Sequence, residues 1–288
     1  MLRNPQPGSF AGAMRDGNGT RKLHHERVVG PGGEPERWLY VLPGIFGAGR
    51  NWGSVGRRLV RERPDWGVSL VDLRQHGMSQ GFQPPHTVQA AAADLEGLAA
   101  VVPPDALLGH SFGGKVALLA AAQPHFRGRV RQLWIIDSTP DAGPPAGSAW
   151  QMLLLLQRLP DDFASRAELV GALTTSRVSL PIAQWMATNL HHVHGRYRWR
   201  FDRDAMEALL RSFFDTDAWA VVEAPPPGPD IHFVRATESS VMSPEAVGRA
   251  RRAGEGGRVH VHDVAGGHWL NADNPDTIVH LLVHNLPR

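Results

Sequence analysis

The sequence predicts an α/β fold, in which a mostly parallel, doubly wound sheet carries one helical insertion. From residue 23 onward, short apolar runs alternate with stretches of helical periodicity, which is typical of parallel sheets. This alternation stops at residue 142, gives way to consecutive helical patterns up to residue 219, and resumes after a Pro/Gly-rich segment at residues 223–229. We therefore expect residues 23–141 and 220–288 to form one α/β core.

The apolar runs before the insertion predict five strands. Several are apolar almost throughout, as expected where both faces of a sheet are covered. The strands are expected at Leu23–Val29, Trp38–Leu42, Val68–Leu73, Ala106–Leu108 and Gln132–Ile136. Apolar residues at helical spacing predict the helices between them, over residues 51–61, 86–101 and 113–123.

The insertion follows the strand that ends at Asp137. Its helical patterns cover residues 148–159, 162–173, 180–190 and 204–214. Because open α/β sheets bind ligands at the carboxyl edge, we expect residues 142–219 to form a helical cap over that edge. After the insertion, strands expected at residues 231–235 and 258–264 alternate with helices expected over residues 243–252 and 275–286.

Composition excludes several classes of protein. A hydrophobic fraction of 42% and a charged fraction of 20% are ordinary for a soluble globular domain. The formal net charge is +2 and the basic residues are not clustered, so no nucleic-acid partner is expected. The absence of cysteine excludes disulfides and thiolate chemistry, and the apolar runs are too short to predict an integral membrane segment.

The first 22 residues are rich in Gly, Arg and Asn, with Asp16 as their only acid. They lack the apolar core of a secretory signal, and we expect a disordered tail. A cytoplasmic location follows from this interpretation. The alternative is a mitochondrial or plastid location, because an acid-poor start that contains arginine is similar to the end of a transit peptide.

A nucleophile motif stands at a strand-to-helix junction. Residues 109–113, Gly109-His110-Ser111-Phe112-Gly113, match the pattern G-x-S-x-G between an apolar strand and a helical stretch. A serine on such a tight turn exposes its hydroxyl above the sheet, and small neighbours let the backbone bend sharply. The following helix also points its N-terminal N–H groups towards negative charge that develops near the serine. The motif therefore predicts Ser111 as a nucleophile.

A serine hydroxyl needs a base, and the base needs a carboxylate that orients it. His268 lies in a loop between the last expected strand and the last expected helix, which is where this motif's chain order puts the base. Two acids compete for the third role: Asp137 ends the strand after the nucleophile helix, and Glu238 follows the next strand of the core. Either side chain could reach His268. We favour Asp137, because the usual position of the later acid holds Ser240.

An oxyanion hole requires two backbone N–H groups aimed at the developing charge. One is expected from Phe112, the residue after the nucleophile. The second is expected from Ile45, in the loop after strand Trp38–Leu42, where the preceding Gly44 allows the amide to turn inward. The side chains expected beside the substrate or behind the catalytic residues are Phe46, Trp185, Glu238, Ser239 and Trp269.

The segments PGIFGAGRNW, VDLRQHGMS, GHSFGGKVA, WIIDSTP, IHFVRATESS and GGHWLNADNPD resemble the α/β-hydrolase superfamily from about Trp38 to the end of the chain. More narrowly, they are similar to abhydrolase-domain-eleven type proteins and to a group of bacterial short-acyl esterases. The resemblance implies the stated roles for Ser111 and His268, and favours Asp137 as the acid with Ser239 nearby. The chain departs from the pattern at Pro43, where a histidine is usual.

The expected activity is cleavage of a carboxylic ester or related acyl bond of a small, apolar substrate. No cofactor and no metal are needed for this chemistry, and we expect His191, His192 and His194 to form a polar surface turn rather than a metal site. Three alternatives remain: an acyltransferase, a carbon–carbon bond hydrolase on the same triad, and a non-catalytic receptor with a hydrolase-like fold. The oligomeric state and the physiological substrate are not predicted.

Overall fold

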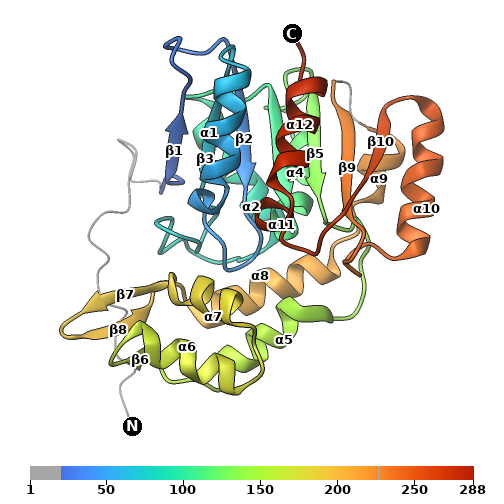
Figure 1. Cartoon of the computed structure of the whole chain (residues 1–288). Coiled ribbons are helices and arrows are strands. Elements are labelled where there is room, and N and C mark those ends of the chain that lie inside the picture. Colours follow the sequence, from blue (N-terminus) through green and yellow to red (C-terminus); the bar gives the residue numbers. More distant parts are fainter. Residues whose placement is uncertain (1–20, 226–227) are drawn as a thin grey trace.

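The computed structural model describes residues 21–225 and 228–288. The tail expected at residues 1–22 therefore lies almost entirely outside the described residues, as do residues 226 and 227 of the expected Pro/Gly-rich joint. The elements follow one another from β1 to α12 along the chain, and the C-terminus and the cap segment lie at opposite ends of the molecule (Figure 1).

In the described residues, a seven-stranded sheet forms the centre of the fold, in the order β1-β3-β2-β4-β5-β9-β10. β1 runs antiparallel to β3, and the other neighbouring pairs are parallel. The expected mostly parallel, doubly wound sheet is therefore confirmed. The strands are β1 (His25–Val28), β2 (Arg37–Leu42), β3 (Trp66–Val71), β4 (Ala106–His110), β5 (Gln132–Ile136), β9 (Asp230–Ala236) and β10 (Val259–Val264).

Short helical segments connect these strands. The expected helix over residues 86–101 is instead two short helices joined at Asp94, which itself keeps helical dihedral angles. Thr87 begins the first of them, because its side chain accepts a hydrogen bond from the N–H of Ala90. The segments are η1 (Gly49–Trp52), α1 (Gly53–Glu62), α2 (Val88–Ala93), α3 (Leu95–Ala99), α4 (Phe112–Ala121), α9 (Trp219–Glu223), α10 (Pro244–Ala253), η2 (Gly254–Gly256), α11 (Leu270–Asp273) and α12 (Pro275–Asn285).

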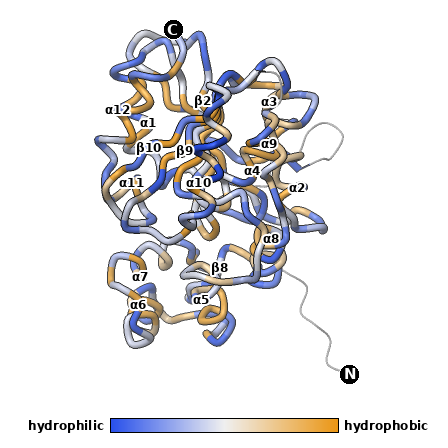
Figure 2. The backbone as a smooth tube through the Cα atoms, turned by 90° about the vertical axis from the view of Figure 1, so that its right-hand side faces the viewer, coloured by the Kyte–Doolittle hydropathy of each residue, from blue (hydrophilic) through white to orange (hydrophobic). Residues whose placement is uncertain are grey.

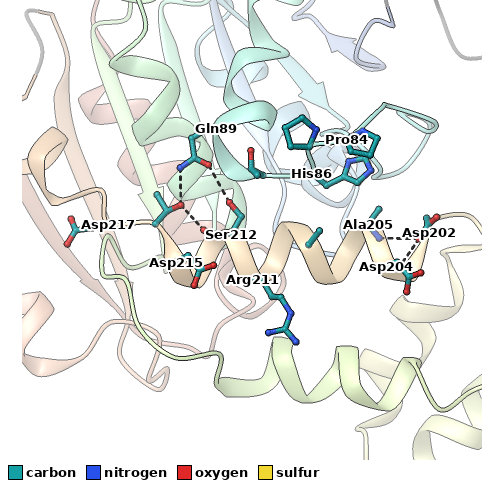
Figure 3. A pocket seen from close by; sticks show the side chains of 14 residues that line it. Pro84, His86, Gln89, Asp202, Asp204, Ala205, Arg211, Ser212, Asp215 and Asp217 are labelled. Carbon is teal, nitrogen blue, oxygen red and sulfur yellow. Dashed lines mark hydrogen bonds between the residues drawn. The ribbon is translucent and has the colours of Figure 1, made fainter.

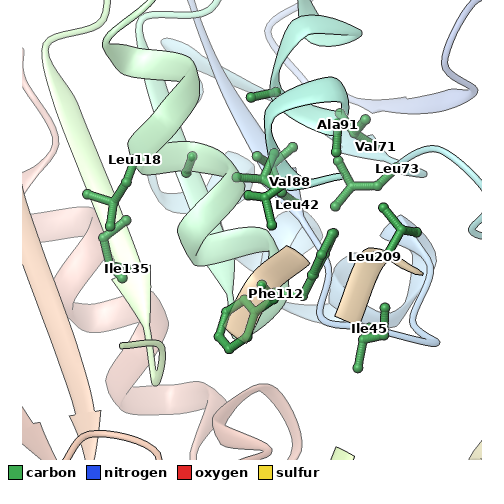
Figure 4. Close-up of a cluster of buried hydrophobic side chains, with 14 of the residues drawn as sticks. Leu42, Ile45, Val71, Leu73, Val88, Ala91, Phe112, Leu118, Ile135 and Leu209 are labelled. Atoms are coloured by element: carbon green, nitrogen blue, oxygen red, sulfur yellow. The ribbon is translucent and has the colours of Figure 1, made fainter. Parts of the chain in front are cut away.

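Alternate residues of each strand feed two hydrophobic clusters, one on each face of the sheet. In β2, Tyr40 and Leu42 belong to one cluster, whereas Leu39 and Val41 belong to the other, as the two-residue period of a strand requires. Helices α2, α4 and α10 cover the first face and α1 and α12 the second. Figure 4 shows part of the first cluster around Phe112, and Figure 2 shows hydrophobic stretches along the central strands.

The segment expected to form a helical cap lies beyond the carboxyl edge of the sheet (Figure 1). It contains helices, as expected, but also a three-stranded sheet in the order β6-β8-β7, so the expectation of helices alone is wrong. Its elements are α5 (Gly147–Leu156), β6 (Asp162–Phe163), α6 (Arg166–Thr175), α7 (Leu180–Ala187), β7 (Leu190–Val193), β8 (Arg196–Trp199) and α8 (Arg203–Asp215).

The small sheet explains where the expected cap helices fail. The helix expected from residue 162 begins only at Arg166, because Asp162 and Phe163 pair with β8. The helix expected up to residue 190 ends at Ala187, and the following residues form a hairpin with β8. His194 and Gly195 make its two-residue turn, both with positive φ, as hairpins of this length require. His191 and His192 therefore lie in a strand and not in the expected turn.

Asp72, directly after β3, ties three segments of the core together. Its carboxylate accepts hydrogen bonds from the N–H of Gly49 at 2.8 Å and of Met78 at 2.8 Å, and it contacts His24 Nδ1 at 3.1 Å. Burial by itself would raise the pKa of Asp72, but the hydrogen bonds from His24, Met78 and Gly49 outweigh it and hold that pKa below its ordinary value. The same contact holds the pKa of His24 above its ordinary value.

We expect Asp72→Asn to lower the free energy of unfolding by about 1–3 kcal/mol near pH 6, because the amide cannot accept all three bonds. The pKa of Asp72 is depressed in the folded state, so its contribution is present above its unfolded pKa of about 4 and is lost as the pH falls. Urea unfolding at pH 6 and at pH 3.5 measures this. A variant whose deficit stays constant between the two values would contradict the assignment.

Candidate active site

Ser111 stands on a strained turn between β4 and α4. Its φ of 52° and ψ of −117° are unfavourable for a residue with a side chain, so the surrounding structure must hold it there. The N–H of Ser111 donates to the carbonyl of Ile136 at 3.0 Å. The carbonyl of Ser111 accepts from the N–H of Gly114 at 2.9 Å and from the hydroxyl of Ser138 at 2.6 Å. The role of Ser138 has no signal in the sequence.

The glycines of the motif allow α4 to cross the sheet at very short range. A Cβ added at Gly109 would lie 2.1 Å from the carbonyl oxygen of Gly113, and one at Gly113 would lie 2.3 Å from that of Leu42. Both distances are far below van der Waals contact, and both obstacles are backbone. The glycines at these two positions are therefore required by packing, and the serine between them is carried to the carboxyl edge of the sheet.

The structure brings Asp137 and His268 together. Asp137 Oδ2 lies 2.6 Å from His268 Nδ1, and its other carboxylate oxygen accepts from the N–H of Ala236 at 3.2 Å. The side chain of Asp137 is 0% exposed, whereas that of His268 is 19% exposed. Asp137 has a φ of 40°, in the left-handed region that aspartate tolerates better than most residues. Because a carboxylate only accepts, the proton of the neutral His268 ring lies on Nδ1, and Nε2 is available to accept a hydrogen bond.

Glu238 and Ser239 occupy a neighbouring loop in a different way. The N–H of Glu238 donates to the carbonyl of Gly266 at 3.0 Å, so the glutamate's backbone supports the loop that carries His268, while the residue as a whole is exposed. The hydroxyl of Ser239 accepts from the N–H of Val241 at 3.2 Å. Of the two acids between which the sequence left a choice, Asp137 is the one in contact with the imidazole.

A small cavity of about 70 Å³ joins the core to the cap beside Ser111. Four core residues that the sequence predicts for the site line it: Ser111, His268, Ile45 and Phe46. Trp185 of the cap and Trp269 of the core also line it, with their ring centroids 4.5 Å apart. Phe112 is not among the lining residues: its side chain is buried in the hydrophobic cluster of Figure 4, with its ring centroid 6.2 Å from that of Phe213 on α8. The remaining lining residues are Gly44, His110, Ser148, Ala149, Met152 and Ile182.

His110 is a buried residue of the site to which the sequence assigned no role. Its Nε2 lies 2.8 Å from the backbone carbonyl oxygen of His268, and since a carbonyl only accepts, this nitrogen must donate. Burial, and then the nearby His268, lower the pKa of His110 to about 3, so the ring is neutral at physiological pH. Its only visible signal in the sequence is its place directly before Ser111.

A second, more open cleft of about 900 Å³ lies between the Pro84–His86 loop and α8 (Figure 3). Its lining includes Asp202, Asp204, Asp215 and Asp217, and contains neither Ser111 nor His268. Hydrogen bonds join Gln89 to Ser212 and Thr216 across it. Size alone would favour this cleft, but the groups capable of acyl chemistry lie in the smaller cavity, which we take as the candidate site.

Within the residues that the structure describes, no group of three or more His, Asp or Glu side chains is arranged to hold a metal ion. In the same residues, no helix has the length and apolar character needed to span a bilayer.

Comparison with known proteins identifies the family. The model of the family described as "Alpha/beta hydrolase family" matches residues 39–281, which is most of the chain. The chain belongs to the alpha/beta hydrolase family. The fold and the class of enzyme expected from the sequence, a hydrolase, are thereby confirmed.

Individual relatives agree with this membership. The sn-1-specific diacylglycerol lipase ABHD11 of Mus musculus is 29% identical over 247 residues, covering 82% of this chain and 76% of that protein. The protein of the same name from Xenopus tropicalis is 29% identical over 277 residues, covering 89% of this chain and 82% of that protein. Among solved structures, a marine microorganism esterase has a TM-score of 0.77 at 22% identity, covering 91% of this hydrolase and 98% of that chain. The last similarity concerns the fold.

The packing behind the Ser111 turn can be tested with a compensating pair. A Cβ at Gly114 would lie 2.6 Å from the Cβ of Ser138. We expect Gly114→Ala to lower the free energy of unfolding by about 1–3 kcal/mol through overpacking, and Ser138→Gly to restore part of that loss in the double variant. Urea unfolding of the two single variants and the double variant measures the coupling. Strictly additive losses would show that the two positions do not compete for space.

Proposed function

We propose that this hydrolase cleaves carboxylic esters of small, apolar acyl groups, with Ser111 as nucleophile, His268 as base and Asp137 as the acid that orients the base. The observation that carries the proposal is the 2.6 Å contact between His268 Nδ1 and the fully buried Asp137, because His268 lines the same cavity as Ser111. A buried carboxylate on one ring nitrogen leaves the other free to accept the serine proton.

The proposed reaction has two steps. His268 Nε2 takes the proton of the Ser111 hydroxyl as the serine oxygen attacks the ester carbonyl, and the N–H groups of Phe112 and Ile45 stabilise the oxyanion. His268 then gives this proton to the leaving alcohol, which departs and leaves Ser111 acylated. In the second step His268 removes a proton from water as the water oxygen attacks the acyl carbonyl; the bond between the acyl carbon and the serine oxygen then breaks, His268 returns the proton to that oxygen, and the carboxylic acid leaves.

The cavity supports a short acyl group. On the scale on which one water needs about 10–15 Å³, a volume of about 70 Å³ holds roughly five to seven water-sized groups. Most of the side chains that line it, such as Met152, Ile182 and Trp185, are apolar. The named relatives include lipases and an esterase, which act on acyl esters by their names. These features together favour an acyl chain of a few carbon atoms over a charged acyl group.

We expect a fluorophosphonate probe to label the wild-type protein at a single serine, and Ser111→Ala to remove the labelling. Hydrolysis of p-nitrophenyl acetate should fall by about 10⁴-fold or more in the variant, because the nucleophile is lost while the fold is kept. Mass spectrometry of the labelled peptide identifies the serine that reacts with the probe, and the rate of p-nitrophenol release measures the hydrolysis. Folded wild-type protein that neither takes up the probe nor turns over any ester would favour the receptor alternative.

The choice of acid is tested by a matched pair of isosteric changes. We expect Asp137→Asn to lower kcat by about 10³–10⁴-fold, because the amide no longer stabilises the imidazolium that forms on His268. Glu238→Gln changes an exposed side chain and should leave kcat within about threefold of the wild type. Rates with p-nitrophenyl acetate at pH 7.5 decide between them. Loss of activity in the Glu238 variant alone would reverse the assignment.

A further inference from the structure

Lys115 is a fully buried cation outside the proposed triad. It lies on α4, one helical turn after Ser111, and is 0% exposed. A buried ammonium is costly unless each of its three donors finds an acceptor. Here Nζ donates to three backbone carbonyl oxygens, those of Asp141 at 2.8 Å, Phe213 at 2.7 Å and Thr216 at 2.9 Å. The ammonium also lies 4.1 Å from the centre of the Phe213 ring.

These three carbonyls belong to the two chain segments that connect the cap to the core. Asp141 is on the segment that enters the cap, and the other two are at the end of α8, where the chain leaves it. The last carbonyls of a helix have no partner within the helix and carry partial negative charge. At the end of α8, that of Ser212 accepts from the Thr216 hydroxyl at 2.6 Å, and that of Phe213 from Lys115.

The two connecting segments are also bonded to each other. The N–H of Gly143 donates to the carbonyl of Phe214 at 2.8 Å, and the N–H of Ala218 donates to the carbonyl of Pro140 at 2.9 Å. The indole N–H of Trp219 donates to the Asp141 carboxylate. The segments that enter and leave the cap, residues 140–143 and 213–219, thus form one junction. The side chain of Lys115, on the helix that follows Ser111, is bonded to both segments.

This junction is close in the chain to one of the two cap helices that line the cavity. Helix α5 begins shortly after Gly143, and its residues Ser148, Ala149 and Met152 line the cavity beside Ser111. Between them, Trp150 packs edge-on against Phe214 of the junction, with ring centroids 6.2 Å apart. A shift of the junction relative to α4 would therefore move the first turns of α5 relative to Ser111.

We propose that Lys115 is a positioning residue, which holds the cap at a fixed distance from Ser111 and thereby limits the length of the acyl group that the cavity accepts. This inference rests on the proposed ester hydrolysis at Ser111. Lys115 touches neither the cavity nor the proposed triad, so its effect passes through the junction and α5.

The chemistry of lysine suits this role. Burial lowers the pKa of Lys115 to about 8, while the nearby carboxylates of Asp141 and Asp217 act in the opposite direction. The group therefore stays mostly protonated at neutral pH and keeps three donors for three acceptors. A methionine has a similar length but no donor, so it would leave three buried carbonyls without that partner and weaken the junction.

The experiment compares Lys115→Met with Arg63→Met in the full-length protein. Arg63 is a matched control, because its guanidinium also donates to three backbone carbonyls, those of Val283, Leu286 and Pro287. These lie beside the C-terminus, at the opposite end of the molecule from the cap (Figure 1). For each protein, kcat and KM are measured with p-nitrophenyl acetate and p-nitrophenyl octanoate, along with fluorophosphonate labelling and the urea midpoint.

We expect Lys115→Met to raise the ratio of kcat/KM for octanoate over acetate about tenfold, mainly through a lower KM for octanoate, with probe labelling retained. Arg63→Met should lower the urea midpoint but leave this ratio within about twofold of the wild type. An unchanged ratio in Lys115→Met would show that the lysine is merely structural and overturn the inference. An equal rise in the Arg63 variant would overturn it too, since the effect would then be general loosening.

If Lys115→Met does not fold, Trp219→Phe takes its place, because it removes one junction hydrogen bond and leaves Lys115 intact. The ratio of kcat/KM for octanoate over acetate should then rise in Trp219→Phe, and an unchanged ratio overturns the inference. Wild-type protein without labelling or turnover would overturn the proposed function together with this inference. Normal wild-type activity with no change in the ratios overturns the inference alone.

Discussion

The close crossing of α4 over the sheet is the constraint on which the rest of the structure depends. Gly109 and Gly113 face each other and the β2 backbone at distances that exclude any side chain. Only this approach lets Ser111 adopt a strained conformation above the strand ends, because the helix and strand then clamp the residue from both sides. The hydrogen bonds to the Ser111 carbonyl from Gly114 and Ser138 keep the turn in place.

Burial on both faces of the sheet supplies the rigidity that this strained turn needs. Each central strand gives alternate side chains to two separate hydrophobic clusters, and each fully buried Leu or Val side chain is worth about 1.5–3 kcal/mol. The loops at the carboxyl edge are held in place because they begin at these buried strands. The carboxylate of Asp72 binds the N–H of Gly49 at the start of η1. Asp137 follows β5 and His268 follows β10, and their side chains come into contact because these parallel strands end at the same edge of the sheet.

The buried polar groups around the site share one pattern, in which backbone carbonyls of loops and helix ends accept hydrogen bonds from side chains of other parts of the core. His110 donates to the carbonyl of His268, Ser138 to that of Ser111, and Lys115 to three carbonyls of the cap junction. A buried carbonyl left without any donor would cost about 1–3 kcal/mol. The carbonyl of Ser111 also accepts from the N–H of Gly114, so Ser138 supplies its second bond. Lys115 of α4 and His110 of β4 thus bond the cap junction and the base loop to the strand and helix that flank Ser111, while Ser138, directly after β5 and Asp137, bonds the nucleophile turn to the neighbouring strand.

The sequence by itself determined the alternating strands and helices, the strained turn at Ser111 and the loop that carries His268, because these depend on local period and on glycines next to a serine. It left open whether Asp137 or Glu238 meets the imidazole, since both loops end at the same edge of the sheet and only side-chain direction separates them. It also missed the hairpin β7–β8, whose pairing joins residues with no helical or apolar signature. Lys115 shows the limit most plainly: three carbonyls distant in the chain converge on it, and carbonyls have no sequence signal.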